Sequence, residues 1–194
     1  MTNKHPGNSR MLMRAWSITG GWSGNIRSVD FWLAVLVCLL CYNFWATELW
    51  WEQVIGVMPN LLGFTLGGFA IFLGFGSDAF RELISDADEE KSPYISVSAA
   101  FLIFVAMQLS ALLFALAMKG LYFPTPSWLF PWVEWIRVGR IAFSGLGYFI
   151  FIYSITLAFR AAMRIFRLSR WYHTFIIAEA ENERISRETR DGDV

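Results

Sequence analysis

Charge is scarce in this sequence. Charged residues make up 16% of its 194 positions and hydrophobic residues 56%, with a mean hydropathy of +0.43. A soluble domain carries about 25% charge, and so short a chain cannot enclose that much apolar surface in its own core. The composition therefore excludes an ordinary water-soluble domain and predicts one all-α unit whose solvent is the lipid bilayer.

An excess of either charge is also missing. The 16 lysine and arginine residues are balanced by 16 acidic residues, so the formal net charge is zero. Proteins that hold nucleic acid through a broad cationic face need surplus positive charge for the phosphates. No direct nucleic-acid binding is expected.

Residues that usually carry catalysis or bind metals are few. The histidines are His5 and His173, and no HExxH, GxSxG or lysine-containing phosphate loop occurs. Cys38 and Cys41 lie in one apolar run, which fits neither a disulfide framework nor a zinc site. The stretch 74–78 resembles the GxGD element of intramembrane aspartyl proteases, but Ser77 interrupts it. We expect no enzyme activity, no cofactor and no metal ion.

Four apolar stretches approach the length of about 20 residues that a membrane-spanning helix needs. They cover residues 31–50, 61–76, 95–118 and 141–159. We expect a four-helix membrane bundle over 31–159, preceded by a cytoplasmic or interfacial segment over 1–30. Residues 160–194 are expected to form a cytoplasmic amphipathic helix that ends in a frayed polar tail from Glu179.

Small residues recur along one side of the second predicted span. Gly63, Gly67, Ala70 and Gly74 follow helical spacing and begin with a GxxxG pair. Where lipid gives helices no hydrophobic reason to associate, small residues let their backbones approach closely. The stripe predicts helix packing and a homo-oligomer. The alternative is that these glycines line a pore, where bare carbonyls can meet ions or water.

Strongly polar side chains are rare inside the predicted spans. Asn43 and Gln108 lie deep in them, and no Asp, Glu, Lys, Arg or His lies near a predicted midplane. Ion-coupled transport and proton relays usually need such residues, so these mechanisms are disfavoured. Asn43 and Gln108 are expected to hydrogen-bond across helices.

Tryptophans gather where the chain is expected to leave the outer side of the membrane. Trp45, Trp50 and Trp51 close the first predicted span, where an indole suits the headgroup region. Trp128, Trp132 and Trp135 follow helical spacing, which predicts a short helix lying in the interface. These rings are interpreted as interfacial anchors, and the alternative is an aromatic ligand site.

Two charged segments face the predicted cytoplasm. The acidic loop contains Asp86, Asp88, Glu89 and Glu90, and the basic stripe after the fourth span contains Arg160, Arg164, Arg167 and Arg170. The loop is interpreted as a solvated segment rather than a cation site, because it lacks the glycine and spacing of a calcium loop. The basic stripe could pair with the loop, with anionic lipid headgroups or with a soluble partner protein.

Two resemblances accompany these patterns. The run 71–75, followed by Ala79 and Arg81, resembles the end of the second helix of bacterial bestrophin-type anion channels. Bestrophins have a large helical region between their second and third spans, where this chain has only residues 77–94, so their pentameric fold does not follow. The layout, with Leu62-Gly63-Phe64 opening the second span and Ser92-Pro93-Tyr94 before the third, is similar to small four-span bacterial membrane proteins.

Some proteins with that layout, such as the membrane subunit of the Kiwa system, serve in anti-phage defence with a cytoplasmic partner. The hypothesis is therefore a non-enzymatic membrane anchor or sensor subunit that forms a homo-oligomer and works with a cytoplasmic protein, with a role in phage defence implied by the resemblance. The alternative is an ion channel or membrane-permeabilising effector whose second helix lines the pore.

The distribution of lysine and arginine predicts the topology. With the N-terminus in the cytoplasm, thirteen of the 16 fall on the cytoplasmic side, and Lys119, Arg137 and Arg140 fall outside. Cytoplasmic flanks of membrane helices retain positive charge. Both termini are thus expected in the cytoplasm of a bacterial cell, with the protein in the inner membrane. Reporter fusions to each terminus check this, and tails on opposite sides would refute it.

Overall fold

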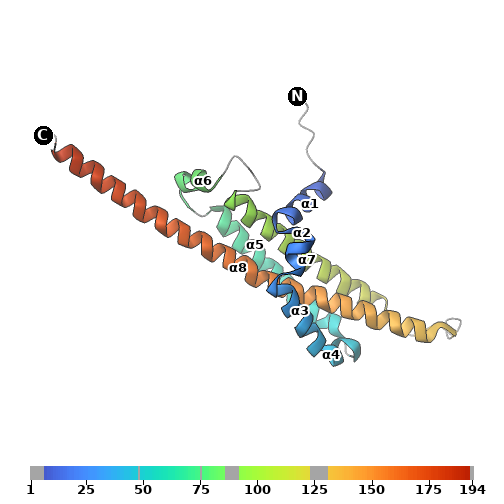
Figure 1. Cartoon of the computed structure of the whole chain (residues 1–194). Coiled ribbons are helices and arrows are strands. Elements are labelled where there is room, and N and C mark those ends of the chain that lie inside the picture. Colours follow the sequence, from blue (N-terminus) through green and yellow to red (C-terminus); the bar gives the residue numbers. More distant parts are fainter. Residues whose placement is uncertain (1–6, 48, 75, 86–91, 123–130, 193–194) are drawn as a thin grey trace.

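The protein is helical throughout the part that our computed structural model describes, residues 7–47, 49–74, 76–85, 92–122 and 131–192. Three long helices lie together, with the shorter helices along their sides and at one end (Figure 1). The helices are α1 (Asn8–Ile18), α2 (Gly21–Ile26), α3 (Val29–Leu40), α4 (Tyr42–Thr47), α5 (Trp50–Gly74), α6 (Asp78–Ile84), α7 (Pro93–Gly120) and α8 (Val133–Gly192). The all-α prediction is confirmed.

Helices α5, α7 and α8 are long and apolar enough to cross a membrane. With 25 and 28 residues, α5 and α7 exceed the roughly 20 residues needed for a hydrocarbon core about 30 Å thick. By length and composition these helices indicate a multi-pass membrane protein.

The bounds of the first two predicted spans need correction. Residues 31–50 do not form one helix, because α3 stops after 12 residues and α4 begins at Tyr42. The indole Nε1 of Trp45 donates a hydrogen bond of 2.8 Å to the carbonyl oxygen of Cys38. This bond satisfies a carbonyl that the broken helix leaves without its usual partner. The second span begins at Trp50 rather than at residue 61, so α5 is longer than predicted.

Contacts between distant residues establish how the helices run. Asp30 at the start of α3 pairs with Arg160 of α8, and Cys38 near its end lies beside Gly145, so the two helices are antiparallel. Helices α5 and α7 are also antiparallel, because Phe72 stacks on Tyr94 and Trp51 contacts Tyr122. We call the two ends of this bundle the arginine end, at Arg160, and the tryptophan end, at Trp50.

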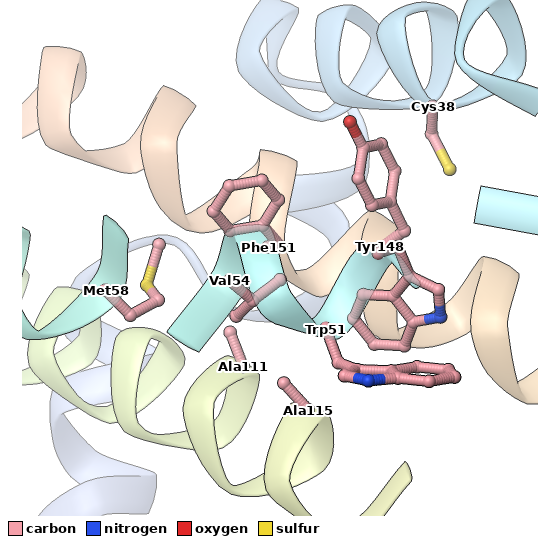
Figure 2. Packing of buried hydrophobic residues seen from close by; sticks show 9 residues of the cluster. Cys38, Trp51, Val54, Met58, Ala111, Ala115, Tyr148 and Phe151 are labelled. Carbon is pink, nitrogen blue, oxygen red and sulfur yellow. The ribbon is translucent and has the colours of Figure 1, made fainter. Parts of the chain in front are cut away.

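A core at the tryptophan end joins α3, α5, α7 and α8 (Figure 2). Its buried residues are Cys38, Trp50, Trp51, Val54, Met58, Ala111, Ala115, Tyr148 and Phe151. Trp50 is fully buried, so Trp50 and Trp51 are core residues and not the headgroup anchors that the sequence suggested. The wide indole rings fit because α8 presents glycine to them: a Cβ at Gly145 would lie 3.0 Å from the Trp45 ring.

Of the two residues predicted to hydrogen-bond across helices, one does so. Gln108 of α7 is fully buried and its Nε2 donates to Thr65 Oγ1 of α5 at 3.1 Å, which confirms the predicted bond across helices. Asn43 of α4 is exposed, and its backbone carbonyl accepts from Thr47 Oγ1 one turn later. The difference follows from position, since Asn43 lies on the short helix and faces outward.

Helix α8 continues far beyond the bundle, and its C-terminal end is distant from the other helices (Figure 1). Its 60 residues extend over about 90 Å at about 1.5 Å each. Phe80 of α6 holds it just past the bundle, with ring centroids 4.8 Å from Tyr172 and 5.5 Å from Phe175. The stretch from Glu179, predicted to fray, is helical to Gly192.

Replacing Gly147 with alanine tests the packing at the tryptophan end. A Cβ there would lie 2.5 Å from the Phe114 ring and closer still to Trp50. Overpacking of this kind costs about 1–3 kcal/mol, so the thermal unfolding temperature in detergent should fall. Gly139→Ala on the same helix is the control, because a Cβ there meets nothing within 4 Å. Equal stability of the two variants would contradict the packing described.

Candidate functional site

The outer face of α5 carries the small-residue stripe. Its buried side chains, among them Val54, Thr65 and Phe72, lie on the side of the helix that packs on α7 and α8. Gly63, Gly67, Ala70 and Gly74 lie on the opposite side and are exposed. A Cβ built on any of these three glycines meets nothing within 4 Å. The stripe therefore makes no close contact within the described part of the chain.

Two polar residues on this face were missed by the sequence reasoning. Gln53 and Asn60 are exposed, and helical spacing places them beside the stripe, with Gly56 continuing it toward the tryptophan end. They were missed because the span was predicted to begin at residue 61. Helix α5 continues through Pro59, although proline usually disrupts the interior of a helix. We call this surface, from Gln53 to Gly74, the outer α5 face.

The outer α5 face has the composition of a helix-packing surface in lipid. Bare glycine backbone permits close approach of a second helix, and an amide side chain can hydrogen-bond across the contact. Within the described residues, the side-chain amide of Asn60 makes one hydrogen bond, a long one of 3.5 Å from its Nδ2 to the Gly56 carbonyl. Its amide is thus available to a partner on this face.

The basic stripe divides into two inward and two outward arginines. Arg160 forms an ion pair with Asp30 of α3, with side chains 20% and 22% exposed. Its Nη1 donates to Asn25 Oδ1 of α2 at 2.8 Å, while its buried Nη2 has no partner in the described structure. Because the pair is largely removed from water, it links α2 and α3 to α8 more firmly than a surface pair would.

Arg164 is the second inward arginine. Its Nη1 donates to the carbonyl oxygen of Ser96 at 2.9 Å and to Ser96 Oγ at 3.2 Å, which ties α8 to the first turn of α7. Arg167 and Arg170 are exposed. Of the predicted stripe, only these last two present their charge to the surroundings.

Asp30 is a site residue that the sequence reasoning did not select. It lies in the first turn of α3, where a carboxylate also suits the positive end of the helix dipole. Ser28 caps the same helix, with its Oγ accepting from the Phe31 N–H at 3.3 Å. The available signal was a lone acid at the entrance of an apolar run, which in lipid calls for a basic partner.

The remaining predicted site residues lie away from the outer α5 face and the basic stripe, or outside the described residues. Trp135 lies in the first turn of α8 and Trp132 directly precedes that helix; both side chains are exposed, and Trp135 belongs to the long helix rather than to a separate short one. Trp128 lies outside the described residues, as do Asp86, Asp88, Glu89 and Glu90 of the acidic loop. Within the residues that are described, no group of three or more His, Cys, Asp or Glu side chains is arranged to hold a metal ion.

Comparison with known proteins returned no match from family models, curated proteins or solved structures. The likenesses to bestrophins and to four-span defence proteins therefore remain predictions from short stretches of sequence.

Exchanging the charges of Asp30 and Arg160 tests their role. Asp30→Arg or Arg160→Asp alone should lower the thermal unfolding temperature in detergent, because each places two like charges in a largely buried site. Loss of a hydrogen bond to a charged group costs about 1.5–3 kcal/mol. The double exchange should recover part of the loss, and Arg167→Asp, at an exposed position, should have little effect. Additive losses in the double exchange would refute the pairing.

Proposed function

We propose that this chain is a multi-pass inner-membrane protein that assembles as a homo-oligomer through the outer α5 face and holds the end of α8 in the cytoplasm for a soluble partner. The observation that carries the proposal is the outer α5 face itself, which combines exposed glycines with exposed amides and has no close contact in the described chain. Its action is anchoring or sensing rather than catalysis.

A second copy of the chain fits this face better than lipid does. Lipid tails pack poorly against a glycine groove and offer no hydrogen-bond partner to Gln53 or Asn60. The same face on a second α5 supplies both, since a two-fold axis brings each stripe against its copy. Interhelical bonds of this kind are worth about 0.6–2 kcal/mol each in membranes.

The end of α8 supports the second half of the proposal. From Ile176 onward its described side chains are exposed, and the ion pairs there are local ones, such as Arg187 to Glu183 at 3.2 Å. Pairs of this kind stabilise a helix by only about 0.2–0.5 kcal/mol. A long exposed helix with so few contacts of its own suits a segment that gains further stability on a partner. Arg167 and Arg170 lie exposed on α8 just before this segment.

A pore along α5 is the second candidate, because the same glycines, Gln53 and Asn60 would give a water-filled passage polar walls. The two candidates differ in what leucine at Gly67 and Gly74 would do. In a packing surface the bulk separates the subunits. In a pore wall it blocks flux while the assembly survives.

Gly67→Leu with Gly74→Leu is therefore the deciding variant. We expect native mass spectrometry of the purified protein to show oligomers for the wild type and mainly monomers for the variant. Leu113→Phe, which adds bulk at an exposed position of α7, is the control and should leave the oligomer unchanged. An assembled variant that loses ion flux in liposomes would favour the pore. A monomeric wild type in lipid would refute assembly altogether.

The partner is tested separately in the native host. A chain that ends after Phe175 should keep its oligomeric state and lose a soluble protein that co-purifies with the full chain. The defence role implied by the resemblance would appear as increased phage plating on a deletion strain, and unchanged plating would count against it.

A further inference from the structure

A groove of about 770 Å³ lies between α1 and α5 with α7 as its floor, apart from the outer α5 face and from the basic stripe. Helix α1 contacts α7 through Ala15, which packs on Ala99 and Ile103. Helix α5 contacts α7 through Phe69, whose ring centroid is 5.1 Å from that of Phe101. The volume falls within the range of about 300–1,000 Å³ typical of small-ligand sites.

The groove has a charged mouth and an apolar interior. Arg10 and Arg14, one helical turn apart on α1, line it together with Ile95 from the first turn of α7, which starts at the arginine end of the bundle. Farther in, the walls are aliphatic and aromatic side chains, including Ile18, Leu66 and Val105. The hydroxyl of Ser98, which also lines the groove, already donates to the Tyr94 carbonyl at 3.0 Å. The interior therefore favours an apolar part of a ligand, and the mouth favours a negatively charged group.

The depth of the groove matches one leaflet of a membrane. It follows α7 from Ile95 to Val105, which is about 15 Å at a rise of about 1.5 Å per residue. The hydrocarbon core of a bilayer is about 30 Å thick, so one leaflet contributes about 15 Å. Since α7 is long and apolar enough to cross the bilayer, an acyl chain standing in its leaflet can occupy the groove over most of its length.

The charges at the mouth select the headgroup. Arg10 is exposed, and its guanidinium makes no hydrogen bond or ion pair in the part of the chain that is described. A guanidinium can hold two phosphate oxygens at once. The contact is favoured near an anionic surface, where each basic residue contributes about 1 kcal/mol. A zwitterionic headgroup gains less, because its own cation faces the same arginines.

We propose that this groove is a binding site for one anionic phospholipid, with acyl chain along α7 between α1 and α5 and phosphate at Arg10 and Arg14. The site rests on the membrane embedding proposed above and does not depend on the oligomer. The lipid would add to the packing of α1, which the described structure holds to α7 through a small cluster around Ala15, Ala99 and Ile103.

The test uses the full chain purified in detergent, with native mass spectrometry and phosphatidylglycerol or phosphatidylcholine carrying identical acyl chains. We expect one phosphatidylglycerol per chain, retained in preference to phosphatidylcholine. Glycerol phosphate, which has the charge without the chains, should not be retained. Arg10→Gln with Arg14→Gln should lower the preference about thirtyfold, which corresponds to about 2 kcal/mol at 1.4 kcal/mol per tenfold.

Two further variants separate this groove from general charge attraction. Arg167→Gln with Arg170→Gln removes the same charge from the same end of the bundle outside the groove, and should leave the preference intact. Leu102→Trp fills the groove from an exposed wall position and should displace lipid of either headgroup, whereas Leu109→Trp, outside it, should not. Equal loss in both arginine pairs, or no retained lipid in the wild type, would overturn the proposal. The same spectra report oligomeric state, so a lipid-bound monomer would refute the oligomer alone.

Discussion

Helices in lipid gain nothing from burying one another's apolar side chains, since the surrounding tails are equally apolar. Contacts must then come from close fit or from polar pairing, and this protein uses each at a different end of its bundle. At the tryptophan end, Trp45 and Trp50 lie over glycines of α8, so wide rings approach a bare backbone. At the arginine end, Asp30 and Arg160 pair in a largely buried site. Together they hold the short α3 and α4 on α8.

The same constraint distinguishes the two faces of α5. The inner face is packed and hydrogen-bonded within the chain. Thr65 accepts a hydrogen bond from Gln108, and Trp50, Val54 and Met58 are fully buried. The outer face carries the same kinds of residue that join helices elsewhere, namely small residues and amides. In the described chain, no other helix packs on them. That asymmetry is the physical basis for proposing assembly, and it also keeps the pore in consideration, since water would satisfy the amides as well.

Some arginines of this chain bond to neighbouring helices and others are exposed, and helical spacing alone does not show which are which. Arg160, Arg164 and Arg167 share helical spacing, yet the first two reach inward to α2, α3 and α7. In the next turns of α8, Leu168 packs against residues of α5, α6 and α7, whereas Arg167 and Arg170 lie on other sides of the helix and are exposed. Arg10 is exposed for a similar reason, because α1 lies at the edge of the bundle beside a groove.

Composition and apolar run lengths predicted long apolar helices, and the structure has three that are long and apolar enough to cross a membrane. Run lengths located α7 well, since its apolar residues continue without proline or charge. Only the tertiary structure decided that the first run breaks at Cys41, where the indole N–H of Trp45 donates to the carbonyl oxygen of Cys38 that the break leaves free. It also decided that α5 begins at Trp50 and that Gln53 and Asn60 share its outer face. The sequence gives the charges and their spacing. The contacts between these groups depend on helices that are neighbours in space but distant along the chain.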